Sequence, residues 1–135
     1  MTPSAFFILG FEDLASIPMP EHLFFHLAFA FILMHEMDAI RCREWRIFPG
    51  LSLLDEKIAF PIFMFVHIPL YALPLYYLQS LPDPEGLIRG LDYFFIIHLF
   101  LHILFLKHKN NEFKDWISWS IIIGCGVFGA LDLLV

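Results

Sequence analysis

Four long apolar stretches run along the chain, separated by short connections that carry most of the charged and turn-forming residues. The stretches cover approximately residues 21–40, 56–78, 87–106 and 116–135. Each has close to the ~20 residues that an α-helix needs to cross the hydrocarbon core of a bilayer. The pattern therefore predicts an all-α protein, an integral membrane four-helix bundle in which residues 1–135 form a single membrane domain.

Residues 1–20 differ from these stretches because Glu12, Asp13 and three prolines interrupt their apolar residues. They contain no Lys or Arg, so the positively charged start of a signal peptide is missing. We expect an N-terminal interfacial segment that lies on the membrane surface without crossing it. The alternative is a short helix packed against the core.

The last apolar stretch contains two pairs of small residues at a spacing of four. These pairs are Gly126 with Ala130 and Cys125 with Gly129. Small residues at this spacing permit close approach of helices in a membrane, although they are also tolerated on a lipid-facing surface.

Composition agrees with the membrane prediction. The chain is 59% hydrophobic, 18% aromatic and only 16% charged, and its mean hydropathy is +0.73. Soluble domains are about half apolar and a quarter charged. The net charge is −6, and no basic patch of the kind that binds nucleic acid is present. The expected partner is the lipid bilayer, and nucleic acid is excluded.

Basic residues gather in two of the three connections. Those between the first and second stretches and between the third and fourth are Arg41, Arg43, Arg46, Lys57, Lys107, Lys109 and Lys114. The connection between the second and third stretches has only Arg89. Since basic connections face the cytoplasm, the sequence predicts a multi-pass protein with both termini outside, N-out and C-out.

Ionisable side chains interrupt the apolar stretches on three predicted helices. They are His35 and Asp38 on the first, His67 on the second, and His98 and His102 on the third. Such groups are costly inside a bilayer and tend to mark a site. At a rise of ~1.5 Å per residue from the basic connections, all five fall in the cytoplasmic half of the membrane. Their shared depth predicts that they meet.

Spacing within each helix supports the same conclusion. His98 and His102 are four apart and share a helix face, and His35 and Asp38 are three apart and share another. Neutral imidazole and carboxylate together suit Zn, Mn or Fe(II). We therefore predict a site for a divalent metal with His35, Asp38, His98 and His102 as ligands.

Glu36 and His67 are the predicted catalytic groups, which would handle protons beside the metal. Glu36 is a quarter turn from His35, and His67 has Tyr71 four residues on to orient its ring. A metal lowers the pKa of its bound water towards ~7. The resulting hypothesis is a metal-dependent hydrolase or transferase that acts on a lipid-linked substrate.

Other interpretations of these residues remain open. Intramembrane histidines are often interhelical hydrogen-bond donors, and Asp38 could pair with Arg41 or Arg43. Haem with axial histidines is disfavoured by the neighbouring carboxylates. The chain could then be a non-catalytic membrane module: an accessory subunit of another membrane protein, an immunity-type protein or a small transporter.

Several motifs carry a resemblance to a known family. They are His35-Glu36-x-Asp38-Ala39-Ile40-Arg41, Glu44-Trp45-Arg46, Phe65-Val66-His67-Ile68-Pro69-Leu70, His98-x-x-x-His102 and Asn111-Glu112-Phe113. Through these motifs, residues 23–115 resemble an uncharacterised family of small bacterial four-helix membrane proteins. More distantly the chain resembles the HXXEE membrane domain, whose second acid is replaced here by Ala39. The resemblance implies a bacterial cytoplasmic (inner) membrane and no particular reaction.

Overall fold

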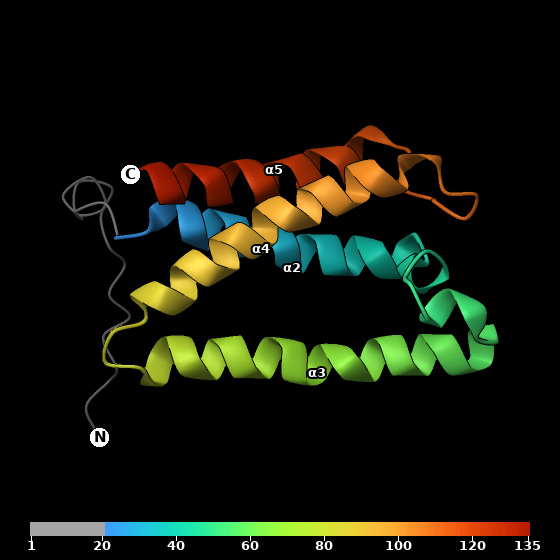
Figure 1. Cartoon of the computed structure of the whole chain (residues 1–135), viewed down its shortest axis with the longest axis horizontal. Helices are drawn as coiled ribbons and strands as arrows, with labels where there is room; N and C mark the ends of the chain where they lie inside the picture. Colours follow the sequence, from blue (N-terminus) through green and yellow to red (C-terminus); the bar gives the residue numbers. More distant parts are fainter. Residues whose placement is uncertain (1–20) are drawn as a thin grey trace, which may run out of the picture.

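The computed structural model describes residues 21–135, so the predicted interfacial segment lies outside the described residues. Four long helices occupy the four apolar stretches (Figure 1): α2 (Leu23–Arg41), α3 (Glu56–Ser80), α4 (Glu85–Leu104) and α5 (Trp116–Leu134). Short 3-10 turns η1 (Glu44–Arg46), η2 (Leu51–Leu53) and η3 (Phe105–Lys107) lie in the connections. The predicted all-helical class is confirmed, and each long helix is long and apolar enough to cross a membrane.

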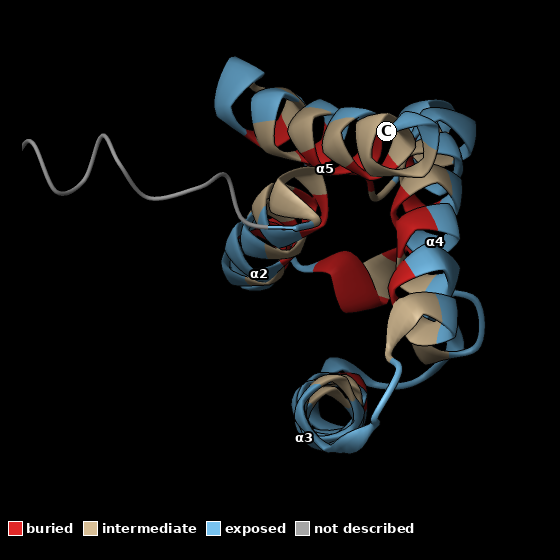
Figure 2. Ribbon diagram, turned by 90° about the vertical axis from the view of Figure 1, so that its left-hand side faces the viewer, coloured by how far each residue is buried: buried red, intermediate tan, exposed pale blue. Residues whose placement is uncertain are grey.

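Three of the helices, α2, α4 and α5, pack around a common interior (Figure 2). Small residues of α5 allow the closest approach. A Cβ atom built on Gly126 would lie 2.6 Å from Leu99 of α4, and one on Gly129 would lie 3.1 Å from the backbone oxygen of Asp92. Cys125 is fully buried beside them. The predicted small-residue face of α5 therefore lies against α4.

Helix α3 lies to one side of this three-helix unit (Figures 1 and 2). Although it has 25 residues, only Ala59 and Phe63 in its first half are buried. Phe63 packs on Trp45 of η1, with 5.6 Å between ring centroids. The sequence predicts a four-helix bundle and does not tell apolar residues that face lipid from apolar residues that face a core. The structure has three closely packed helices and a fourth, α3, that contacts them through a few side chains, among them Phe63, His67 and Leu78.

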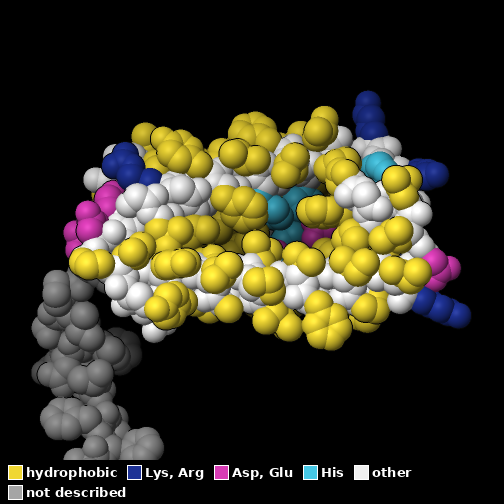
Figure 3. Space-filling view, turned by 60° about the horizontal axis from the view of Figure 1, so that its bottom comes forward, with side chains coloured by type: hydrophobic (Ala, Val, Ile, Leu, Met, Phe, Trp, Pro, Cys, Tyr) yellow, Lys and Arg dark blue, Asp and Glu magenta, His cyan; other side chains and the backbone are white. Residues whose placement is uncertain are grey.

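The two basic connections lie at the same end of the molecule. The side-chain amide of Asn110 donates to the backbone oxygen of Arg46, 3.3 Å away, and Arg46 lies 3.5 Å from a carboxylate oxygen of Glu112. We call this the basic end. Figure 3 shows charged side chains at the two ends of the molecule and hydrophobic side chains between them. At the opposite end α2 and α4 begin and α5 finishes (Figure 1).

Candidate metal centre

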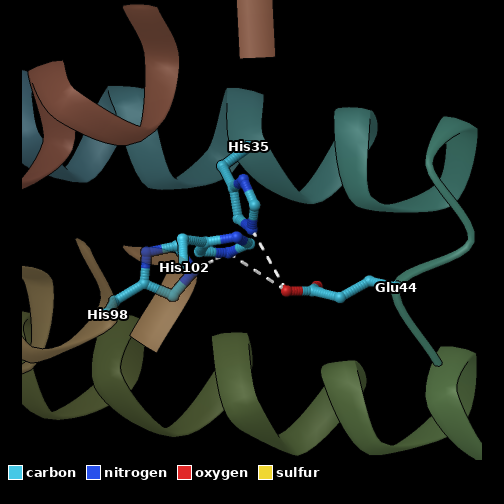
Figure 4. Close-up of side chains that lie close together, drawn as sticks. All are labelled: His35, Glu44, His98 and His102. Atoms are coloured by element: carbon cyan, nitrogen blue, oxygen red, sulfur yellow. Dashed lines mark hydrogen bonds and ion pairs between the residues drawn. The ribbon is translucent and has the colours of Figure 1, made fainter. Parts of the chain in front are cut away.

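Four side chains converge near the basic end of the three-helix unit (Figure 4). His35 comes from α2, Glu44 from η1, and His98 and His102 from α4. Each offers one nitrogen or oxygen atom, and these four atoms all lie within 4.8 Å of one another. All four residues are buried. We call them the four-residue cluster.

Distances within the four-residue cluster match those around a small metal ion. The Nε2 atoms of His98 and His102 are 3.2 Å apart, and His102 Nε2 is 3.2 Å from Glu44 Oε1. His35 Nε2 is 3.6 Å from the same oxygen. In a tetrahedral zinc site with bonds of 2.0–2.1 Å, ligand atoms lie about 3.4 Å apart. Three pairs in the four-residue cluster are thus at the right separation for an ion, and the other pairs, within 4.8 Å, would have to come closer.

His35 lacks the partners that a buried imidazole needs. Its side chain is 0% exposed, and neither ring nitrogen has a hydrogen-bond partner in the described structure. Its ring packs against those of His98, His102 and Phe113, with centroids 4.4, 4.7 and 5.3 Å away. Leaving such a polar group unpaired costs roughly 1–3 kcal/mol. A metal ion bound to Nε2 would give His35 a partner.

Glu44 reaches the cluster because the chain reverses directly after α2. The backbone of Arg43 has the left-handed conformation, with φ 51°, which residues other than glycine rarely adopt. The reversal turns η1 back over the end of α2, and Trp45 is buried beside it against Phe63. The strain at Arg43 is thus offset by burial of Trp45, and it directs Glu44 inward.

Glu44 is an anion in this setting. Burial by itself raises the pKa of the Glu44 carboxyl, but the contacts with His102 and His35 outweigh burial and hold that pKa well below its usual range. An anionic oxygen among three imidazoles is a suitable donor for a divalent cation.

A narrow cleft reaches the four-residue cluster from the surface between α4 and the α2–α3 connection. It has a volume of about 250 Å³ and is lined by Glu44, His98 and His102 together with Ile47, Phe48, Pro49, Leu101 and Phe105. Figure 3 shows histidine and acidic side chains at the bottom of a hollow between hydrophobic ones. A mainly apolar molecule could approach the cluster along this route.

Residues 21–135 match a family of unknown function, DUF6713. The chain belongs to this family. No curated protein and no solved structure matches it. The expectation of an uncharacterised family is confirmed, and the more distant likeness to the HXXEE domain stays a prediction.

The structure places Asp38, predicted as a ligand, outside the four-residue cluster. Its Oδ1 accepts from Arg41 Nε at 2.7 Å, and its Oδ2 accepts from Ser118 Oγ at 2.6 Å. Arg41 also lies 2.8 Å from Asp115, at the start of α5. Asp38 thus ties the end of α2 to the start of α5, which is the ion-pair alternative raised by the sequence.

Glu36 and His67, the predicted proton-handling groups, meet each other between α2 and α3. His67 Nε2 lies 2.9 Å from Glu36 Oε2, while His67 Nδ1 contacts the backbone oxygen of Phe63. They line a separate cleft of about 190 Å³ together with Tyr71, whose ring centroid is 5.6 Å from that of His67. Of the six predicted site residues, three therefore lie in the four-residue cluster and two form this second pair.

Glu44 is the cluster member that sequence reasoning missed. It lies six residues beyond Asp38 and past the end of α2, so helical spacing gives it no relation to His35. The available signal is that Glu44 belongs to the Glu44-Trp45-Arg46 motif, one of those that carry the family resemblance. The direction of the turn depends on Arg43 and is not visible in the residue pattern.

Proposed function

We propose that this chain is a membrane protein with a centre for one divalent metal ion, bound by His35, Glu44, His98 and His102. Zn²⁺ is the first choice, and Mn²⁺ or Fe²⁺ are the alternatives, because all three accept imidazole and carboxylate ligands. The observation that supports the centre is the combination of a fully buried His35 that makes no hydrogen bond and three cluster distances of 3.2–3.6 Å.

The membrane part of the proposal is supported by the four apolar helices and by the surface of α3. Most of the large apolar side chains of α3 are exposed, and the lipid of a bilayer would cover them. We further propose a bacterial cytoplasmic membrane with the basic end facing the cytoplasm. The metal centre would then lie in the cytoplasmic half.

The proposed activity is a metal-dependent hydrolase or transferase that acts on a lipid-linked substrate. A metal held by histidines lowers the pKa of a bound water to ~7 and so provides a nucleophile at neutral pH. The apolar side chains of the cleft, Leu101 and Phe105 among them, suit the lipid part of a substrate. The Glu36–His67 pair, 2.9 Å apart, is suited to hold and pass on a proton.

A specific observation favours a second candidate, a non-catalytic module whose metal is structural. Four protein ligands complete a tetrahedral shell, as in structural zinc sites, whereas catalytic sites keep one position open. A catalytic centre would need room for water, either as a fifth ligand or in place of one of the four side chains. In the non-catalytic case all four side chains would stay bound, and the ion would join α2, η1 and α4.

The first experiment measures metal in protein purified in detergent. The wild type is expected to carry about one ion per chain, and His98→Ala/His102→Ala almost none, because that variant removes two of four ligands. The matched control is His26→Ala/His108→Ala, which removes two histidines outside the four-residue cluster and should keep the ion. Equal, substoichiometric metal in the wild type and the cluster variant would contradict the proposal.

Chelation then separates the two candidates. A structural ion stabilises the folded state, so its removal should lower the melting temperature strongly. A catalytic ion with one position open to water joins fewer side chains, so its removal should lower the melting temperature less. The His98→Ala/His102→Ala variant gives the melting temperature of a chain without the ion.

A further inference from the structure

Asp92 of α4 is a second buried group without partners, away from the four-residue cluster. It is 0% exposed, and neither of its carboxylate oxygens has a hydrogen-bond partner in the described structure. A buried carboxylate that lacks both hydrogen bonds and a counter-charge is strongly disfavoured. Asp92 therefore needs either a proton or a cation.

Asp92 lines a large cavity at the end opposite the basic end. The cavity has a volume of about 580 Å³ and is lined by Glu21, His22, Leu23, Phe24, Glu85, Arg89, Asp92, Asp132, Leu133, Leu134 and Val135. We call it the acidic cavity, because four carboxylates face it against one arginine and one histidine. Figure 3 shows acidic and basic side chains gathered at this end of the molecule.

Asp132 of α5 is placed to act with Asp92. Gly129 packs against the backbone of Asp92, and Asp132 lies about one turn further along the same face of α5. Asp132 Oδ1 accepts from the backbone N–H of Phe25 at 2.9 Å, and its Oδ2 lies 2.8 Å from His22 Nδ1. The position of Asp132 is thus fixed by two contacts, while each of its oxygens can still accept another bond.

The positive groups of the acidic cavity are directed at other acids. His22 bridges two carboxylates, since its Nε2 lies 3.0 Å from Glu85 and its Nδ1 faces Asp132. Arg89 is more than half exposed and lies 3.5 Å from Glu85. Within residues 21–135, no basic side chain forms an ion pair with Asp92.

We propose that the acidic cavity is a second cation site, in which a hard divalent cation of the Mg²⁺, Ca²⁺ or Mn²⁺ class binds between Asp92 and Asp132. Carboxylate oxygens are the ligands that such cations prefer, and these ions commonly keep several waters. A cavity of about 580 Å³ has room for the ion and those waters. The site is independent of the four-residue cluster, because the two share no residue.

The test is titration of the full chain in detergent with Mn²⁺, monitored through the electron paramagnetic resonance signal of the free ion. Asp92→Asn keeps the shape of the side chain and removes its charge, so it should weaken Mn²⁺ binding at this site by more than about 10-fold. Asp83→Asn is the matched control. Asp83 lies in the α3–α4 connection outside the cavity, and an Asn there can still accept from the backbone of Glu85.

Two further variants make the result decisive. His98→Ala/His102→Ala should keep the Asp92-dependent Mn²⁺ binding, even if the proposed metal centre is lost or never existed. Asp132→Asn should weaken the same binding, and it carries the test if Asp92→Asn does not fold.

Equal Mn²⁺ binding by the wild type and Asp92→Asn would overturn the proposal and would mean that Asp92 is a protonated acid. Loss of all Mn²⁺ binding in the histidine variant would overturn it as well, because the ion would then lie at the four-residue cluster.

Discussion

Two acids near His35 have separate roles at the scale of single residues. Asp38 lies on α2 one turn after His35, and both of its oxygens bind groups outside the four-residue cluster, Arg41 and Ser118. Glu44 lies outside α2, yet its Oε1 is within 3.6 Å of two imidazoles. Helical spacing therefore predicted the three histidines that the structure brings together, whereas the acid that lies beside them is Glu44 and not Asp38.

This difference leads to a prediction for Glu44→Gln. The amide keeps the size of the side chain but loses the anionic oxygen that balances a divalent cation. Loss of a residue that only hydrogen-bonds to a metal ligand typically lowers metal affinity about 10- to 100-fold. Loss of the ligand itself in Glu44→Gln should lower the affinity further. Titration of the apo protein with Zn²⁺ against a chromophoric chelator measures the change.

Asp38→Asn is the control for the same prediction. Zn²⁺ affinity should stay within a few-fold of the wild type, while the free energy of unfolding should fall slightly through the weakened pair with the exposed Arg41. The opposite result, with Zn²⁺ lost in Asp38→Asn and kept in Glu44→Gln, would restore the ligand assignment that the sequence suggested.

The sequence predicted that the three histidines lie together, because their positions follow from spacing within a helix. A shared face follows from the spacing of His98 and His102, and a shared depth follows from counting residues from the basic connections. Glu44 depends on the backbone conformation of Arg43 at φ 51°, which the packing of Trp45 stabilises. Contacts of that kind form between elements, so a residue pattern within one element does not reveal them.

At the scale of elements, the interface between α4 and α5 is the part of the fold most sensitive to side-chain size. We predict that Gly126→Ala lowers the free energy of unfolding by about 1–3 kcal/mol, the usual cost of overpacking. Its Cβ would lie 2.8 Å from the Cβ of Leu99, which cannot move without the α4 backbone. Thermal unfolding in detergent measures the effect.

Gly90→Ala is the matched control in the same pair of helices. Nothing lies within 4 Å of a Cβ atom at Gly90, so the substitution meets no neighbour. It should raise the free energy of unfolding by about 0.5–1 kcal/mol, because alanine is the better helix former. If both variants had the same stability, the close approach of α5 to α4 would be wrong.

Helix α3 shows that a hydrophobic pattern can locate a helix without revealing how the helix packs. It is as apolar as α5, yet a smaller share of its residues is buried. Apolar side chains satisfy a lipid environment and a protein core equally well, so hydropathy locates the helix and does not give its packing. The two helices differ in glycine: α5 has Gly124, Gly126 and Gly129, whereas α3 contains no glycine.

At the scale of the whole molecule, the two proposed cation sites lie towards opposite ends of one three-helix unit. Helix α4 contributes to both, since Asp92 lines the acidic cavity and His98 and His102 belong to the four-residue cluster. Phe95 lies between them on the same face and is 1% exposed, in contact with the rings of Phe25 and Phe29. The two sites are therefore separated by an aromatic layer and should bind their ions independently.

The distribution of charge over the two ends leads to a prediction of orientation. Seven of the eight basic residues in the chain lie in the two connections at the basic end or directly beside them. The opposite end holds only Arg89. In a bacterial cytoplasmic membrane the basic end should face the cytoplasm.

Alkaline phosphatase fused after Val135 should then be active and a fluorescent protein at the same position dark. Fusions after Asn110, in the connection between α4 and α5, should behave in the opposite way. A fluorescent fusion at Val135 with inactive phosphatase would reverse the orientation and would place the four-residue cluster in the outer half of the membrane, where a cytoplasmic substrate could not reach its cleft.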